Sequence, residues 1–316
     1  MPASMDALTE ALIDYAGLFP PAKLNMGPAC SAFARHLQSE DASRISHFVC
    51  PASRLDELTK HGAALMPGTY ATSGYREMAD ASEPWKVSAI LQAEHAEEGF
   101  AAVGAFNERH RTEDRGLARV DTVEVKAPSA AFIDEAIAAA DGDLFPFFEI
   151  DHREDPRGLI AALSGQRAAA KIRCGTVEVS GMPTSEQVSR FIHACALGDV
   201  VFKATAGLHH PIRGTYRLTY DDNPPMGQMH GFVNVFLASA FVYAIKLSHE
   251  LTIALLDETD AAKFAFDDAG AVWHSPDGEL HVSTDQIAAC RSRFAVSYGS
   301  CSFDEPVNES RELGWL

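Results

Sequence analysis

Charged and polar side chains recur at alternate positions in four apolar segments near the middle of the chain. These segments are residues 122–126, 147–151, 169–173 and 201–205. Side chains two residues apart in a β-strand point to the same face, so each segment would gather its charges on one face. Burying so many charges costs several kcal/mol each unless they are paired. We therefore expect the four strands to converge on a reaction centre and the protein to be an enzyme.

Lysine and carboxylate side chains supply the chemistry expected at this centre. Lys171 and Lys203 fall on the sixth and seventh predicted strands, which are neighbours in a barrel. Two ammonium groups held close together in a desolvated pocket lower each other's pKa, and a neutral lysine attacks carbonyl carbon atoms. One lysine would form an imine while Glu149 or Asp151 moves protons. The predicted catalytic residues are Lys171, Lys203, Glu149, Asp151, Glu124, Lys126, His209 and His210.

The two lysine segments resemble the class I aldolases of the deoxyribose-phosphate aldolase type. That family carries its Schiff-base lysine at the start of a K-x-x-x-G stretch on strand six, and a second lysine on strand seven before a turn of small residues. Here residues 171–175 read Lys-Ile-Arg-Cys-Gly and residues 203–207 read Lys-Ala-Thr-Ala-Gly. The resemblance implies that Lys171 forms the Schiff base and that Lys203 tunes its pKa. Residues 202–207 are the better local match to the nucleophile motif, so reversed roles stay open.

The resemblance covers residues 168–213, and some features of the chain depart from it. Arg173 beside Lys171, the adjacent histidines after strand seven and the long connection that follows have no counterpart in those aldolases. The overall pattern, including residues 14–21, also resembles an uncharacterised bacterial family, and that second resemblance implies no activity.

Arginines and glycines near the last two predicted strands indicate an anionic substrate. Barrels often bind phosphate through backbone N–H groups of the loops after strands seven and eight, and arginine adds bidentate contacts to carboxylate or phosphate. The alternative is that these glycines only turn the chain. The predicted substrate-binding residues are Arg173, Arg213, Gly207, Thr205, Ser300 and His230.

The histidines also leave a metal-dependent reaction open. His209 or His210 could join His230 and a carboxylate in the mixed nitrogen and oxygen ligand set of a hydrolytic site, although HExxH and HxH motifs are absent from the sequence. The leading prediction is a lyase without a cofactor or metal. The alternatives are a hydrolase or isomerase that uses a divalent metal, and a protein that binds a small molecule without turning it over.

Cysteines at strand ends and cysteines in helices have different expected roles. None lies in a CxxC motif, so a disulfide framework is not indicated. The helical set, Cys30, Cys195 and Cys290, is expected to consist of small buried hydrophobic residues. A thiol nucleophile or a soft metal site is conceivable only for the strand-end set, which consists of Cys50, Cys174 and Cys301.

The elements that must position these residues alternate between strand and helix along the chain. Eight strands with intervening helices predict a (β/α)8 (TIM) barrel; a doubly wound sheet is the alternative, but GxGxxG and P-loop motifs are absent. The predicted strands cover residues 12–19, 46–50, 86–91, 121–126, 144–151, 168–174, 200–206 and 294–303. The predicted helices cover residues 28–37, 53–61, 95–109, 130–140, 157–164, 185–197, 231–247 and 283–293, followed by a short C-terminal helix.

Three segments are insertions relative to a minimal (β/α)8 barrel. Residues 66–84 read as a loop on the side opposite the chemistry, and residues 264–282 as a small β-hairpin insertion. Residues 207–230, which we call the lid segment, contain prolines and glycines that predict a long loop without regular structure over the site. None indicates a separate domain, so residues 1–316 are predicted to form one barrel domain.

The amino-acid composition limits the classes of partner expected for this protein. The 316 residues are 47% hydrophobic and 22% charged, which is ordinary for a globular protein, and the formal net charge of −18 disfavours nucleic acid. No apolar run reaches the roughly 18 residues of a membrane span, and the N-terminus lacks signal-peptide features. We expect a cytoplasmic enzyme whose partner is a small anionic substrate, with a homo-oligomer left open.

Overall fold

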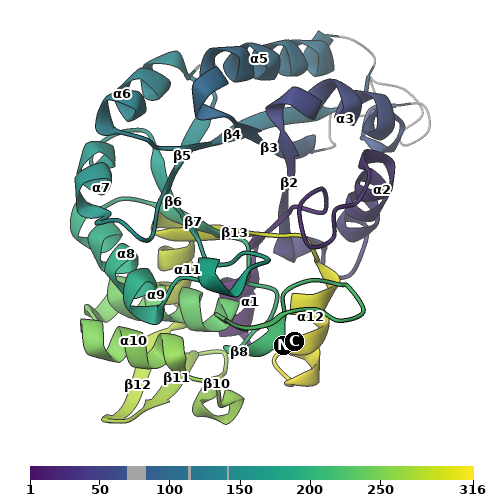
Figure 1. Cartoon of the computed structure of the whole chain (residues 1–316). Coiled ribbons are helices and arrows are strands. Elements are labelled where there is room, and N and C mark those ends of the chain that lie inside the picture. The colour runs from purple at the N-terminus through teal and green to yellow at the C-terminus, as the bar shows by residue number, and fades with distance from the viewer. Residues whose placement is uncertain (70–82, 113–114, 141) are drawn as a thin grey trace.

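The parallel strands of the protein close into a barrel, in the order β1-β13-β7-β6-β5-β4-β3-β2 (Figure 1). The computed structural model describes residues 1–69, 83–112, 115–140 and 142–316. The (β/α)8 fold predicted from the sequence is confirmed, including its short first strand. The barrel strands are β1 (Ile13–Tyr15), β2 (Ile45–Pro51), β3 (Trp85–Leu91), β4 (Ala118–Lys126), β5 (Phe145–Ile150), β6 (Ala169–Arg173), β7 (Phe202–Thr205) and β13 (Ala295–Ser300).

Helices surround this barrel (Figure 1). Local sequence defines several of their ends: α8 and α11 each begin at a capping box, in which the N-cap hydroxyl and a glutamine three residues later satisfy backbone groups. The helices that the sequence predicted are α2 (Met26–Leu37), α3 (Leu55–Gly62), α5 (Ala96–Thr112), α6 (Ala130–Ala139), α7 (Arg157–Leu163), α8 (Ser185–Gly198), α9 (Phe232–Ile245), α11 (Thr284–Arg293) and α12 (Asp304–Glu312).

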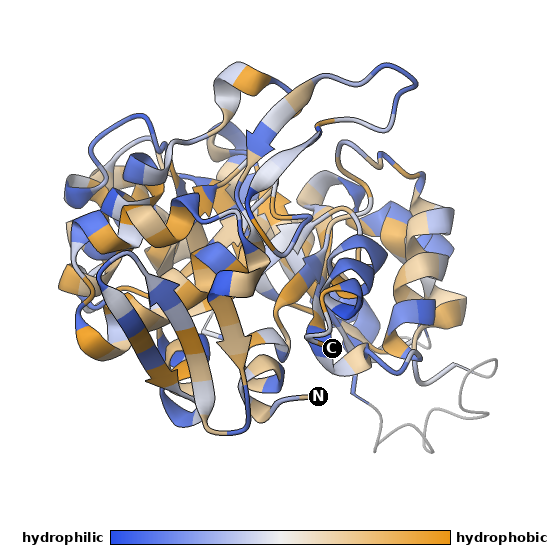
Figure 2. Ribbon diagram, turned by 90° about the horizontal axis from the view of Figure 1, so that it is seen from below, coloured by the Kyte–Doolittle hydropathy of each residue, from blue (hydrophilic) through white to orange (hydrophobic). Residues whose placement is uncertain are grey.

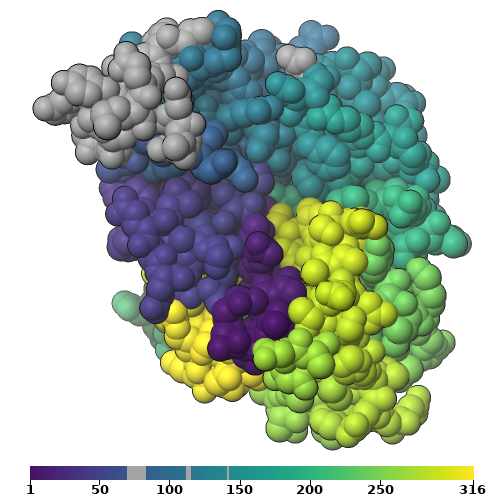
Figure 3. Space-filling model, turned by 180° about the vertical axis from the view of Figure 1, so that it is seen from behind, coloured from purple at the N-terminus to yellow at the C-terminus, as the bar shows by residue number. Residues whose placement is uncertain are grey.

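Among the described residues, the helices α1 (Ala3–Thr9) and α10 (His249–Asp257) were not predicted. α1 is only seven residues long and has no side-chain cap, so its sequence gives little helix signal. It packs against α11, and Figure 3 shows the N-terminal residues in dark purple on the face turned away from the viewer of Figure 1. Most of the predicted loop at 66–84, namely residues 70–82, lies outside the described residues.

Apolar residues concentrate on the strands and on the inner sides of the helices (Figure 2). α9 is apolar around its whole circumference, and it is almost completely buried between the barrel and the neighbouring helices α8, α10 and α11. Among the described residues, no helix is both long enough and apolar enough to cross a membrane.

Both insertions contain regular structure. The lid segment holds an antiparallel ribbon of β8 (Gly214–Arg217) and β9 (Met226–Met229), so the prediction of an irregular loop was wrong. Its prolines do not prevent pairing because Pro224 and Pro225 precede β9 rather than interrupt it. The insertion at 264–282 is a three-stranded sheet, one strand larger than the predicted hairpin: β10 (Phe264–Phe266), β11 (Gly270–Ser275) and β12 (Gly278–Ser283).

Candidate active site

A pocket of about 420 Å³ opens at the C-terminal ends of the barrel strands, where active sites of this fold lie. Glu124, Glu149 and Lys171 line it from inside the barrel. The loop after β7 and the lid segment form other parts of its wall, through His209 and Tyr220 among others. The pocket therefore joins the charged strand residues to the lid segment.

Strand register places the two lysines side by side, as the sequence predicted. Lys171 on β6 is the pairing partner of both Glu149 on β5 and Lys203 on β7. Lys171 Nζ lies 2.8 Å from Glu124 Oε2 and 2.8 Å from Glu149 Oε2. Lys203 Nζ lies 2.6 Å from Glu124 Oε1 and 2.6 Å from Asp14 Oδ2. Of the two lysines, only Lys171 lines the pocket; Lys203 is 1% exposed and is not part of the pocket wall.

The expected lowering of the lysine pKa values was wrong. Burial by itself lowers the pKa of Lys171 and of Lys203, but the two carboxylates that contact each ammonium group outweigh burial and raise both pKa values above the ordinary range. Burial conversely raises the pKa of Glu124 and Asp14, and the lysines outweigh it and hold these carboxyls well below their usual range. Both lysines are therefore ammonium ions in the resting protein.

A histidine that sequence reasoning missed extends this network. His47 on β2 bridges two carboxylates, with its Nδ1 3.0 Å from Asp14 Oδ1 and its Nε2 2.9 Å from Asp121 Oδ1. Asp121 is the extra residue of a β-bulge in β4, because Val120 and Thr122 pair with consecutive residues of β3. Burial lowers the pKa of His47, but the hydrogen bonds and charges of the two aspartates raise it to about 9.

Eight side chains thus form a continuous series of alternating charges, which we call the charge row. Four carboxylates alternate with four cations, so the row is neutral when His47 is protonated. Pairing of this kind removes most of the cost of burying each charge. Hydroxyl groups add to it: Ser88 donates to Glu124 and Ser297 donates to Asp14. In order, the charge row is Asp121, His47, Asp14, Lys203, Glu124, Lys171, Glu149 and Arg173.

We expect His47→Gln to weaken the pH dependence of stability on the alkaline side. Histidine has a pKa of about 6.5 in an unfolded chain, whereas His47 has a pKa of about 9 in the fold. Protonated His47 therefore stabilises the native state fully below about pH 6.5, and this contribution, at most roughly 3 kcal/mol, is lost as the pH rises through the folded pKa. Urea midpoints measured across this interval should fall steeply in the wild type and less steeply in His47→Gln.

The exposed residue His281 provides the control, because His281→Gln should leave the slope unchanged. His209, whose pKa is also raised to about 9, keeps part of the slope in every variant. A slope that is identical in wild type and His47→Gln would contradict the ion-paired state of His47.

The adjacent histidines connect the lid segment to the C-terminal helix. His209 Nδ1 lies 3.1 Å from Glu305 Oε2, and His210 Nδ1 lies 2.8 Å from Glu309 Oε1. His210 also stacks on Tyr216 of β8, with 3.5 Å between the ring centroids. Figure 1 shows β8 and α12 side by side, which matches these contacts. Both histidines line the pocket.

The structure separates the other predicted site residues into two groups. Lys126, Arg173, Thr205 and Gly207 line the pocket. The remaining four have other partners and do not line it. Asp151 pairs with Arg153 at 2.5 Å, Arg213 contacts Asp257 at 3.3 Å and His230 at 3.0 Å, and Ser300 Oγ donates to the carbonyl of Ser302 at 2.6 Å.

The ligand set considered for a metal is not brought together. His230 contacts the carbonyl of Pro183 through Nε2, and burial together with Arg213 lowers its pKa to about 4. Nowhere in the described ranges do three or more His, Cys, Asp or Glu side chains gather in an arrangement that could hold a metal ion.

Close backbone packing explains the glycines of the two lysine motifs. Gly207 has a φ of +69°, and a Cβ atom added there would lie 2.6 Å from Cα of Gly175. The turns that follow β6 and β7 therefore touch through their backbones, which only glycine permits. Gly207 therefore has a structural role in turning the chain, and it also forms part of the pocket wall.

Two cations at the pocket remain available to a ligand. Lys126 at the end of β4 and Arg217 at the end of β8 both line the pocket and are exposed. Neither forms an ion pair with any residue in the part of the chain that the structure describes. Sequence reasoning missed Arg217, because nothing in its local sequence relates the lid ribbon to the barrel mouth.

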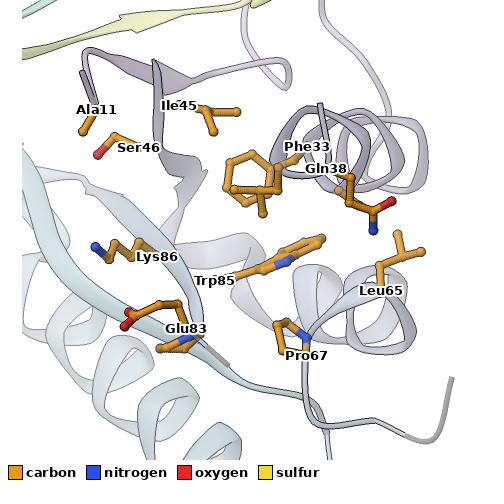
Figure 4. Close-up of a pocket in the computed structure, with 13 residues that line it drawn as sticks. Ala11, Phe33, Gln38, Ile45, Ser46, Leu65, Pro67, Glu83, Trp85 and Lys86 are labelled. Carbon is orange, nitrogen blue, oxygen red and sulfur yellow. The ribbon is translucent and has the colours of Figure 1, made fainter. Parts of the chain in front are cut away.

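A larger pocket of about 550 Å³ lies elsewhere, near the N-terminal ends of β2 and β3 (Figure 4). Phe33, Leu65 and Trp85 form its apolar side, and Glu83 and Lys86 are its charged residues among those described. Its described lining lacks the convergent carboxylates and lysines of the first pocket. We therefore place the candidate active site at the smaller pocket.

Comparison with known proteins adds no relative. A scan against models of protein families finds no match, and a search of curated proteins finds no similar sequence. The (β/α)8 fold itself fits an enzymatic role.

Proposed function

We propose that the protein is a lyase of the class I aldolase type, in which Lys171 forms an imine with a small anionic carbonyl compound. One observation carries the proposal: Lys171 Nζ lines the pocket at the C-terminal ends of the strands and lies 2.8 Å from each of two carboxylates. A buried amine beside proton acceptors, open to a pocket on one side, has the parts needed for imine chemistry.

The raised pKa of Lys171 requires a proton acceptor before the amine can react. Glu149 contacts Nζ, lines the pocket and is the more exposed of the two carboxylates, with 18% of its side chain accessible. In the proposed step, Nζ passes a proton to Glu149 and bonds to the carbonyl carbon. The carbonyl oxygen takes a second proton from Nζ and the first one back from Glu149 and leaves as water, and the resulting iminium accepts the electron pair of the carbon–carbon bond that breaks.

Accessibility supports Lys171 rather than Lys203 as the nucleophile. Lys203 does not line the pocket, and its Nζ lies 2.6 Å from a carboxylate oxygen of Asp14 and 2.6 Å from one of Glu124. Its fixed charge competes with Lys171 for Glu124, so it lessens the rise in the pKa of Lys171 that Glu124 causes. Lys203 is thus proposed to be the tuning lysine, in agreement with the order that the aldolase resemblance implies.

The charge of the pocket rim supports an anionic substrate. Lys126 and Arg217 reach the pocket without an ion-pair partner in the described ranges, and Arg173 contacts Glu149 at a loose 3.3 Å. Cations without partners, next to a site whose other charges are balanced, favour a carboxylate or phosphate on the ligand.

Reductive trapping tests the proposal. The native protein is incubated with pyruvate, glyoxylate, acetaldehyde or glyceraldehyde 3-phosphate, reduced with borohydride and mapped by peptide mass spectrometry. We expect one stable adduct at Lys171, with exposed Lys60 as the internal control for random labelling. Trapping in the presence of a chelator should be unchanged, because the proposed step uses no metal. Absence of a Lys171 adduct with all four compounds would refute the imine.

A further inference from the structure

A second group of reactive side chains lines the same pocket from the side of the C-terminal helix. Cys301 Sγ lies 3.8 Å from His209 Nε2, and His209 Nδ1 lies 3.1 Å from Glu305 Oε2. The hydroxyl of Tyr220 contacts both ends of this arrangement, at 3.9 Å from Cys301 Sγ and 2.8 Å from Glu305 Oε2. We call these four residues the Cys301 cluster, and all of them line the pocket.

Two stretches of the chain build the cluster: the lid segment supplies His209 and Tyr220, and the turn from β13 into α12 supplies Cys301 and Glu305. Cys301 follows β13, His209 belongs to the loop after β7, and Glu305 lies in the first turn of α12. Cys301 and His209 are 5% and 6% exposed, so the pocket is the side from which a ligand reaches them. A buried thiol, an imidazole and a carboxylate in sequence have the order of a nucleophile, its base and the group that orients the base.

The state of His209 fits that order. Burial lowers the pKa of His209, but contacts with Cys301 and Glu305 raise it to about 9. Other titratable groups near the thiol are Tyr220 and Tyr15, and burial raises the pKa of Tyr15 to about 12, with the charge of Cys301 adding to the rise. With this pKa the His209 ring is protonated near neutral pH, and a cation beside a cysteine sulfur is the setting in which cysteines react as thiolates.

The other five cysteines provide a contrast within the same molecule. Burial raises the pKa of the thiols of Cys30, Cys174 and Cys290 to about 12 and that of Cys50 and Cys195 in the same direction. None of the five has a hydrogen bond to a histidine among the described residues. Buried thiols of this kind are inert.

We propose that Cys301 is a second nucleophile of this pocket, activated by His209 and oriented through Glu305, that adds reversibly to the carbonyl carbon of an aldehyde. In this step the thiolate sulfur, beside protonated His209, forms a bond to the carbonyl carbon. The π electrons of the carbonyl move to its oxygen, which takes a proton from the His209 ring, and His209 regains its proton from water. The product is a hemithioacetal, and no oxidant or further reactant takes part.

Alkylation with a limiting amount of iodoacetamide tests the activation of the thiol. In native protein at neutral pH, Cys301 should react before the other five cysteines, at about tenfold the rate of Cys174 or more, because thiolate content controls reactivity. His209→Gln should lower the Cys301 rate by about tenfold. His210→Gln is the matched control, since it removes the neighbouring contact to Glu309 and leaves Cys301 with its imidazole. Equal rates in wild type and His209→Gln would overturn the activation.

Protection by an aldehyde tests the addition itself. Propanal should slow the alkylation of Cys301 in Lys171→Met, where no imine can form at residue 171, whereas 1-propanol at the same concentration should not. Protection that is lost in Lys171→Met, or that 1-propanol reproduces, would overturn the addition. The outcome is independent of the lyase proposal, because residue 171 cannot form an imine in Lys171→Met and the alkylation rate of Cys301 is measured directly.

Discussion

Lys171→Met should reduce trapping of the carbonyl compound that labels the wild type to background, a loss of about 10³-fold or more, since no other group replaces a missing nucleophile. The fold should survive this change. Methionine has a side chain of similar length, Glu124 keeps Lys203 at 2.6 Å, and Glu149 keeps Arg173 at 3.3 Å. A circular dichroism spectrum like that of the wild type and a cooperative urea transition, at the lower midpoint expected when a buried ion pair loses one member, would show that the loss is chemical.

Lys203→Met is the matched comparison, because it removes the neighbouring ammonium group at the same level of the barrel. Lys171 would then have Glu124 to itself, so its pKa should rise further and the pH at which trapping is half-maximal should move upward. Trapping should persist at alkaline pH. If Lys203→Met abolishes trapping at every pH while Lys171→Met retains it, the two lysines have the reverse roles.

Glu124→Gln should destabilise the protein by about 3–5 kcal/mol, the range found when one member of a buried ion pair is removed. Glu124 is 2% exposed and accepts from Lys171, Lys203 and Ser88. An isosteric amide leaves two buried ammonium groups with one carboxylate each and no shared counter-charge. Urea unfolding at neutral pH measures the effect, and Glu135→Gln on the exposed face of α6 should change stability little.

The pH dependence of this destabilisation distinguishes the loss of an ionised carboxylate from other causes of instability. Because the folded pKa of Glu124 is held below its unfolded value, its contribution is present above about pH 4.5 and is lost as the pH falls toward the folded pKa. The difference in stability between wild type and Glu124→Gln should therefore shrink in acid. A constant difference down to strongly acidic pH would contradict an ionised Glu124.

The same variant should alter the nucleophile. With less negative charge nearby, the pKa of Lys171 should fall, so trapping by the effective carbonyl compound should occur at lower pH than in wild type. An upward or absent shift would mean that Glu124 does not set the charge state of Lys171.

Alternation of polar and apolar residues was sufficient to predict the barrel and the meeting of Lys171 with Lys203, because strand parity and order fix which side chains share a level. It was insufficient for the lysine pKa values. Glu124 and Glu149 raise the pKa of Lys171, and Asp14 and Glu124 raise that of Lys203. Asp14 comes from a three-residue strand more than 180 positions away in sequence from Lys203. Pairing across a closed barrel is a tertiary property that no local sequence pattern predicts.

Two other predictions failed for different reasons. The β-bulge at Asp121 turns that side chain toward His47, and a period of two cannot indicate a bulge. Arg213 was assigned to the substrate because it follows strand seven, but it pairs with Asp257 at the end of α10, a helix that the sequence did not predict. Proximity in sequence to a strand end was not a sufficient guide to the pocket.

The charge row also limits how this barrel can change over evolutionary time. Each interior member of the row has an oppositely charged neighbour on both sides, so a single neutral replacement leaves unbalanced charge in the interior. Drift at these positions should therefore proceed by paired exchanges, such as the joint loss of Lys203 and Asp14, rather than by isolated substitutions. Among diverged descendants of this sequence, the row should shorten by cation–carboxylate pairs and keep its neutrality.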